Sequence, residues 1–141
     1  LRKRLHADCT ATDRPSGALI ADLKRRGLLD QTLVVWVGEF GRLPTSQEGT
    51  GRDHNMHAFT ALLAGGGFKT GHVHGATDEF GHRATIDRVS VLDLLATMLH
   101  QVGLDHTRLT YRHNNLAESL TDARTTDAAV VGELLKAPVR A

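Results

Sequence analysis

Six side chains that can bind metals or anions follow one apolar run of the sequence within twenty residues. Carboxylate oxygens and imidazole nitrogens ligate divalent metals such as zinc and manganese. Guanidinium groups bind phosphate or sulfate through paired hydrogen bonds. The stretch therefore predicts a site for a metal, an oxyanion or both, built from Glu39, Arg42, Arg52, Asp53, His54 and His57.

These residues allow different roles, which the sequence leaves open. Glu39 and His54 are the candidate metal ligands. Asp53 either orients the His54 imidazole through a hydrogen bond or caps a turn. Arg42 and Arg52 either clamp an anion or form ion pairs with the two carboxylates of the stretch and so fix the loop. The ligand spacing is loose, so the metal signal is weak when taken alone.

A buried strand is expected to position these side chains. Residues 33–37 form an unbroken apolar run that is rich in β-branched residues and too short for an amphipathic helix, and Gly38 ends it. Such a run is typical of a strand buried on both faces of a parallel sheet. Ligand sites of open α/β sheets lie where the strands release the chain into loops. The candidate residues would therefore lie at the carboxyl edge of such a sheet.

A helix is predicted before this strand. Asp13 or Ser16 can cap its start, and Gly27 is suited to its end. Residues 1–12 show no clear periodicity and are expected to be disordered or loosely packed. The order of helix, short loop and buried strand indicates an α/β unit.

Further elements follow along the chain. Residues 58–64 predict a second buried strand, although their alanines and leucines also suit a helix. Residues 68–88 indicate an irregular excursion with a short hairpin. A capped amphipathic helix is predicted over 90–102, from a Ser with an Asp three residues later and a stripe of apolar residues. A short strand over 109–112 and a final helix over 127–137, closed by Pro138, complete the predicted single domain.

Composition excludes several classes of protein. The 17 basic and 16 acidic residues are mixed, with one Trp and one Tyr, which speaks against a nucleic-acid partner. No segment has the roughly 18 apolar residues of a membrane span. The single cysteine, Cys9, cannot form an intrachain disulfide. Nine histidines in 141 residues favour a metal site. Among them, His72 and His74 are expected to be exposed loop residues rather than ligands.

Six segments resemble, in order, the C-terminal part of an uncharacterised sulfatase-like family, a domain of unknown function, within the alkaline phosphatase superfamily. They are DLKRRGLLDQTLVVW, GEFGRLP, GRDHNMH, LLAGGGFKTGHVHGATDEFG, VLDLLATMLHQVGLDH and RLTYR. The resemblance implies a partial three-layer α/β/α sandwich with a mostly parallel sheet, alkaline-phosphatase-like. It also implies a metal-dependent hydrolase that acts on phosphate or sulfate esters.

The same resemblance implies roles for individual residues. Glu39-Phe40-Gly41 stands where the superfamily has Asp-His-Gly, so Glu39 would replace an aspartate ligand. His54 would match a histidine ligand, and the metal would be zinc, manganese or calcium. Phe40 cannot ligate, which puts a complete two-metal site in doubt, and His57 offers an additional ligand or acid/base group. The alternative is a noncatalytic or degenerate member that serves binding or scaffolding.

The resemblance further implies that the nucleophile lies upstream of this chain. Residues 1–141 would then be the C-terminal fragment of a longer hydrolase and inactive alone, with no catalytic residue of their own. Its expected partner is a small anionic ester, without nucleic acid and without a transmembrane segment. Apolar surface left uncovered would favour self-association. The family resembles exported proteins, which implies an exported or periplasmic location.

Overall fold

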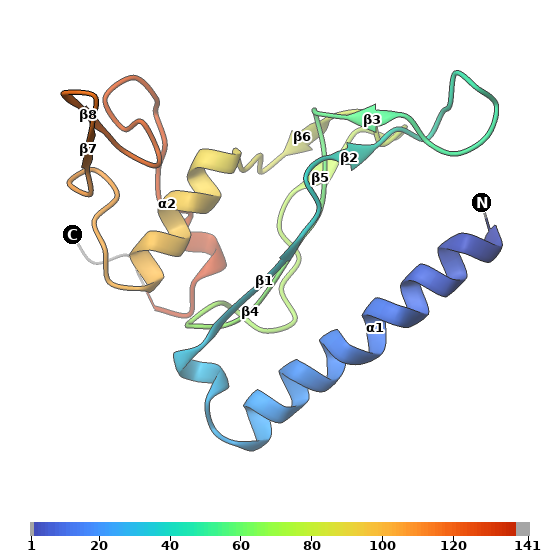
Figure 1. The fold of residues 1–141 in the computed structure, drawn as a ribbon, viewed down its shortest axis with the longest axis horizontal. Coiled ribbons are helices and arrows are strands. Elements are labelled where there is room, and N and C mark those ends of the chain that lie inside the picture. Colours follow the sequence, from blue (N-terminus) through green and yellow to red (C-terminus); the bar gives the residue numbers. More distant parts are fainter. Residues whose placement is uncertain (1, 138–141) are drawn as a thin grey trace. The chain divides into compact units, whose positions relative to one another are not determined.

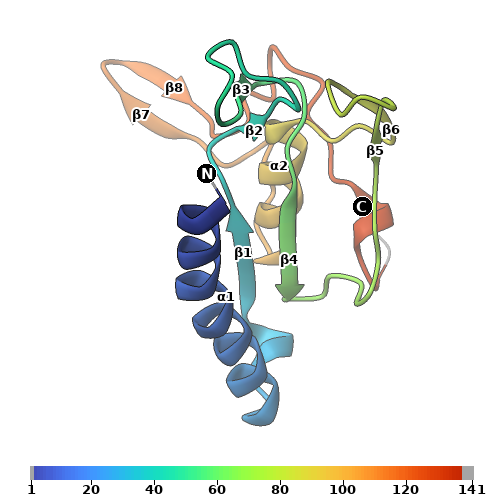
Figure 2. The ribbon, with the colours of Figure 1, turned by 90° about the vertical axis from the view of Figure 1, so that its right-hand side faces the viewer.

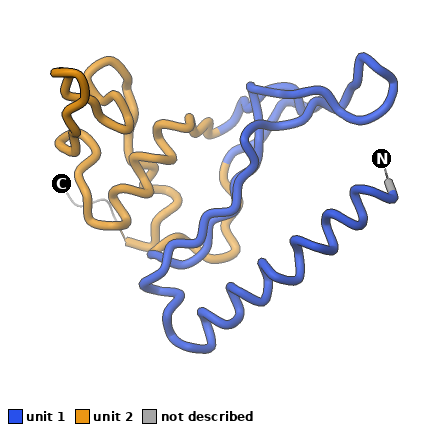
Figure 3. The backbone as a smooth tube through the Cα atoms, viewed as in Figure 1, with its two compact units in different colours: residues 1–66, 75–86 blue, residues 67–74, 87–141 orange. Residues whose placement is uncertain are grey.

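The computed structural model describes residues 2–137, which contain two α-helices and eight short strands (Figure 1). The chain divides into two compact units (Figure 3). Unit 1 comprises residues 1–66 and 75–86, and unit 2 comprises residues 67–74 and 87–141. The candidate residues predicted from the sequence all lie in unit 1.

Helix α1 spans Arg2–Arg25 and opens unit 1. The predicted start at Asp13 or Ser16 is wrong, because both residues lie inside the helix. Ser16 does not act as a cap, since its hydroxyl donates to the carbonyl of Thr12, four residues back, at 2.7 Å. Such back-bonding is the usual way in which a serine is accommodated within a helix.

The central sheet of unit 1 is an antiparallel pair. Strand β1 spans Leu33–Val37, the predicted bounds, and β4 spans Ala61–Gly65, so the second predicted strand begins three residues late. The predicted burial on both faces is wrong for both strands, since Trp36 and Leu62 are about half exposed. The two run side by side in opposite directions (Figure 2), with Leu33 opposite Gly65 and Val37 opposite Ala61. A short 3-10 turn, Leu29–Gln31, precedes β1. No helix lies between β1 and β4.

The predicted fold class is therefore wrong. Each of the four sheets has two antiparallel strands, so the structure is not an α/β/α sandwich with a parallel sheet. A parallel pair needs a crossover of a dozen or more residues, usually a helix. The chain instead returns from β1 through a small antiparallel ladder and enters β4 in the opposite direction. The remaining pairs are β2 (Gly41–Arg42) with β3 (His54–Asn55), β5 (Ala76–Thr77) with β6 (Ala84–Ile86), and β7 (Tyr111–His113) with β8 (Leu116–Glu118).

Helix α2, Val91–Gln101, carries the core of unit 2 and confirms the prediction over 90–102. Ser90 and Asp93 form a complete capping box at its start. Ala96 and Thr97 on this helix are fully buried. The Thr97 hydroxyl donates to the Asp93 carbonyl at 2.7 Å and accepts from the Val131 N–H at 2.9 Å. The same residues therefore hold the helix and the tail of the chain together.

The predicted final helix over 127–137 is wrong, since only a 3-10 turn at Gly132–Leu134 forms there. Beyond the bonds of that turn, backbone groups of this tail bond to other segments of the chain. The Lys136 N–H donates to the Gly67 carbonyl at 2.9 Å, and the Lys69 N–H donates to the Leu134 carbonyl at 2.8 Å. These bonds place Leu135 beside Phe68, and both side chains are only 3% exposed. The predicted end at Pro138 lies outside the described residues.

The carboxylate of Asp93 gives unit 2 a pH-dependent contribution. Partial burial acts to raise the pKa of Asp93, but hydrogen bonds outweigh it and the pKa lies below its ordinary value. The Ser90 N–H donates to one oxygen at 2.8 Å, and the Ala129 N–H donates to the other at 3.0 Å. This stabilisation is therefore complete above the unfolded pKa of about 3.9 and is lost as the pH falls through the lower folded pKa.

We expect Asp93→Asn to lower the free energy of unfolding by about 1 kcal/mol at neutral pH, the usual cost of a lost cap. The difference from the wild type should shrink at about pH 3, where the carboxylate begins to protonate. Urea unfolding at both pH values measures it. Asp127→Asn, a matched change at an exposed Asp of the same unit, should have little effect at either pH. An Asp93→Asn deficit that does not change with pH would contradict this assignment.

Candidate functional site

Strands β2 and β3 bring Arg42 and His54 together. The two residues are directly opposite in the antiparallel ladder, so their side chains share one face. Phe40 lies beside them, with its ring centre 3.9 Å from that of His54. The Arg42 guanidinium carbon lies 5.1 Å from the Phe40 ring centre, within cation–π range. We call these three residues the Phe40–Arg42–His54 cluster.

The two arginines do not neutralise the carboxylates of the loop. No ion pair involving Arg42 or Arg52 is present in the part of the chain that the structure describes. Arg42 donates instead to the Arg52 carbonyl at 3.2 Å, and Arg52 to the Gly51 carbonyl at 2.9 Å. A guanidinium has five N–H donors, so most of those on Arg42 remain available. The ion-pair alternative left open by the sequence is thus not the arrangement found.

Asp53 closes the loop between β2 and β3. Its carboxylate accepts a hydrogen bond from the Gln47 N–H at 3.0 Å. Its backbone bonds to Leu43 at 2.8 Å and to Thr45 at 3.1 Å, which extends the ladder beyond β2. Of the two roles that the sequence allowed, the turn-forming role is therefore the one with observed contacts.

Asn55 holds the site in place through buried hydrogen bonds, a role that the sequence does not predict. Its side chain is 2% exposed, and the amide nitrogen donates to the carbonyls of His82 at 3.0 Å and Gly81 at 3.4 Å. The amide oxygen accepts from the His57 N–H at 2.9 Å. Asn55 therefore joins β3 to the turn between β5 and β6. No pattern in the sequence distinguishes it from the exposed residues on either side, His54 and Met56.

That turn is organised by Asp78. Its carboxylate accepts backbone N–H groups from His82 at 2.8 Å, Arg83 at 3.1 Å and Phe80 at 3.2 Å. The bond from His82 is the largest influence, and together these donors lower the pKa of Asp78. The turn thus presents the two carbonyls that Asn55 needs in a fixed position.

A pocket of about 300 Å³ lies beside the cluster. This volume is at the lower end of the range for small-molecule sites. Of the six candidate residues, Arg42 lines the pocket, and the other five are not among its lining residues. The walls consist of Gly38, Phe40, Gly41, Arg42, Ala58, Phe59, Thr60, Thr77 and Gly81.

The described residues do not fit a complete metal site. No group of three or more His, Cys, Asp and Glu side chains within residues 2–137 is placed to hold an ion. A protein-bound zinc usually has three or four such ligands. Glu39 is exposed, and the His54 ring contacts Phe40. Glu39 and His54 stay a predicted pair of metal ligands, and His57 stays a predicted further ligand.

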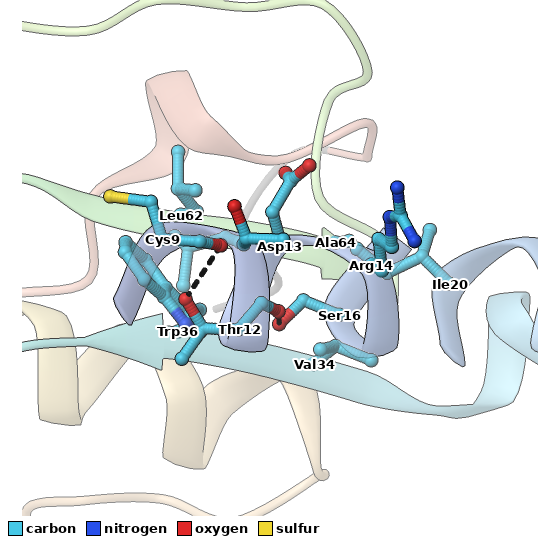
Figure 4. Close-up of a pocket in the computed structure, with 12 residues that line it drawn as sticks. Cys9, Thr12, Asp13, Arg14, Ser16, Ile20, Val34, Trp36, Leu62 and Ala64 are labelled. Carbon is cyan, nitrogen blue, oxygen red and sulfur yellow. Dashed lines mark hydrogen bonds between the residues drawn. The ribbon is translucent and has the colours of Figure 1, made fainter. Parts of the chain in front are cut away.

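A larger groove of about 610 Å³ lies between α1 and the β1–β4 sheet (Figure 4). Its sheet wall is apolar, and Trp36 and Leu62 there are 52% and 56% exposed. On the helix wall, the Thr12 and Ser16 hydroxyls donate to carbonyls of α1 itself. None of the candidate residues lines the groove. Its helix wall also carries Cys9, Asp13 and Arg14, so the groove combines an apolar wall with a polar one.

Neither of the two helices in the described part of the chain is both long enough and apolar enough to cross a bilayer.

The comparisons with known proteins give one match. The family model DUF1501, described as a protein of unknown function, matches residues 1–135. No match was found among curated proteins or among solved structures. These findings correct the resemblance to a sulfatase-like family of the alkaline phosphatase superfamily. The family that matches is described only as one of unknown function, and nothing in the comparisons supports that superfamily.

Proposed function

The chain belongs to the DUF1501 family, and from the geometry of its own residues we propose that it binds the phosphate or sulfate group of a small ester. The observation that carries the proposal is Arg42, a residue that lines a pocket and whose guanidinium has no carboxylate partner among the described residues. Charge-assisted bonds from arginine to an oxyanion are about twice as strong as neutral ones. Arg42 is thus the principal anion-binding residue of the proposed site.

The surroundings of Arg42 support this role. Phe40 packs against the guanidinium, which limits the orientations that the side chain can adopt. His54, directly opposite in the ladder, adds an imidazole donor on the same face. Phe40 and Phe59 give the pocket apolar surface for the organic part of an ester. A small anionic ester matches these features in charge, size and polarity.

Titration with sodium sulfate tests the proposal, because sulfate keeps its charge throughout the neutral range. We expect Arg42→Ala to weaken binding by about 10-fold to 100-fold, the equivalent of one or two charged hydrogen bonds. The sulfate affinity of Arg42→Lys should lie between those of the wild type and Arg42→Ala, since lysine keeps the charge but not the planar fork. Isothermal titration calorimetry provides the affinities.

Arg52→Ala is the matched control, because Arg52 is an exposed arginine of the same loop that does not line the pocket. It should bind sulfate as the wild type does. Equal losses in Arg42→Ala and Arg52→Ala would show that only the general positive charge of the loop matters.

We further propose that the chain is one portion of a metal-dependent hydrolase of such esters and does not turn them over alone. The support is that the described residues supply anion-binding groups but fewer than three clustered metal ligands. Hydrolysis of 4-nitrophenyl sulfate or phosphate by the purified chain would contradict this. The alternative, a noncatalytic binding protein, is favoured by Phe40, which fills a position beside His54 with a ring that cannot ligate.

Self-association is a further proposal for unit 1. Trp36 and Leu62, directly opposite in the ladder, are about half exposed on one face of the β1–β4 sheet. A two-stranded sheet is only marginally stable in water without additional strands or packing. Burying these side chains against a second copy of the chain would stabilise the sheet. The molecular mass in solution, measured by sedimentation equilibrium, tests this self-association.

A further inference from the structure

We infer that His72 and His74 form a two-histidine binding site for a divalent transition metal, with Cu(II) bound most tightly. The sequence favours exposed loop histidines at these positions. The structure adds that the two rings are neighbours, with centres 5.9 Å apart and planes inclined by 45°. Both histidines belong to unit 2, whereas the residues proposed to bind the ester belong to unit 1.

The ring separation is within reach of a single ion. A metal lies about 2.0 to 2.1 Å from an imidazole nitrogen, so two rings bound to one ion have centres at most about 6.4 Å apart. The observed separation is below that limit. Tetrahedral or square-planar angles at the metal require the centres to approach by about a further 1 Å, which rotation about the side-chain torsions supplies.

The backbone places both imidazoles on the same side. Residues 72–75 are in neither helix nor strand, and in an extended segment side chains two apart point the same way. Val73, between them, is 88% exposed, and His72 is exposed as well. Gly71 and Gly75 flank the pair with φ of 65° and 75°, a conformation suited to glycine. The glycines thus turn the chain on each side of the His-x-His segment.

Both imidazoles are available for coordination. Apart from their mutual ring contact, neither has an ion pair or side-chain hydrogen bond with another described residue. No third His, Cys, Asp or Glu side chain joins them within residues 2–137. The protein therefore provides two nitrogen ligands, and water or a small ligand would occupy the other positions. Imidazole nitrogens suit copper, nickel and zinc, whereas magnesium and calcium prefer oxygen.

Titration of the untagged chain with CuCl₂ tests this site, with calorimetry for affinity and electron paramagnetic resonance for the ligands. We expect a Cu(II) site with two nitrogen ligands from the protein, and weaker binding of Zn(II), following the usual order of stability. His72→Ala and His74→Ala should each weaken Cu(II) binding by about 10-fold or more, because one of two ligands is lost. MgCl₂ should not bind.

His100→Gln is the control, since it removes a histidine of the same unit from helix α2, away from the His-x-His segment in the sequence. It should leave Cu(II) binding and the two-nitrogen spectrum unchanged. Unaltered Cu(II) affinity in the double variant His72→Ala/His74→Ala would overturn the inference. A two-nitrogen signal that persists in that double variant would also overturn it.

Discussion

Replacing Gly65 by alanine should lower the free energy of unfolding by about 4 kcal/mol, the sum of backbone strain and overpacking. An added Cβ would lie 2.2 Å from each of two carbonyl oxygens, those of Leu29 and Thr32. Both are backbone atoms, which cannot move away as a flexible side chain would. Gly65 also has φ of 71°, a conformation that alanine adopts only at a cost. Chemical denaturation of the two proteins measures the difference.

Gly71→Ala separates the two causes. Gly71 has a similar φ of 65°, but nothing lies within 4 Å of an added Cβ. Only the conformational cost applies there, and we expect a loss of about 1 to 2 kcal/mol. If Gly65→Ala is no worse than Gly71→Ala, the close approach of the 29–32 turn to the end of β4 is not as described.

Replacing Gly41 by alanine should disrupt the site itself. An added Cβ would lie 1.7 Å from the Ala58 carbonyl oxygen and 3.1 Å from that of Asn55. The β2–β3 ladder would have to move away from residue 58, carrying Arg42 with it. We expect a loss of about 3 kcal/mol in the free energy of unfolding, since overpacking against backbone is at the upper end of its range. Sulfate binding should weaken at least as much as in Arg42→Ala.

Gly38→Ala is the matched control for Gly41→Ala, because both glycines line the same pocket. At Gly38 an added Cβ would meet only the Phe40 carbonyl oxygen at 3.6 Å, an ordinary contact. Its stability and sulfate affinity should therefore remain close to those of the wild type. A large loss in Gly38→Ala would indicate that any side chain added to the pocket is harmful, whatever its contacts.

Local signals in the sequence predicted the elements that depend on nearby residues. Strand β1 has the predicted bounds because its apolar run ends at Gly38. Helix α2 follows its capping box, which involves residues only three apart. The glycine run at the end of β4, Gly65 to Gly67, adopts the positive φ expected of a turn. Each of these features depends on residues that are close together in the sequence.

Features that depend on distant partners were not predictable. Nothing in β1 alone specifies that its partner runs antiparallel, because that depends on the connection to β4. The tail over 127–137 has helical periodicity, but several of its N–H groups bond to residues far along the chain. Ala129, for example, donates to the Asp93 carboxylate, 36 residues away. Such long-range bonds overrode the local preference for a helix.

The candidate site shows the same division. The sequence located the stretch from Glu39 to His57, since its residue types stand out after an apolar strand. It did not predict the ladder that places Arg42 opposite His54, nor the packing of Phe40 against both. The resemblance places Phe40 where a metal ligand would be missing, whereas in the structure its ring packs against Arg42 and His54. The metal ligands themselves remain predictions.

Mapping sulfate binding by ¹H–¹⁵N nuclear magnetic resonance tests the central claim most directly. If the pocket beside the Phe40–Arg42–His54 cluster binds the anion, the largest shifts should occur at the backbone amides of residues 40–42 and at the Arg42 side-chain Nε–H. The backbone amides of residues 40–42 should not shift on sulfate addition in Arg42→Ala. Shifts concentrated elsewhere, or none at residues 40–42, would contradict the proposal that this pocket is an oxyanion site.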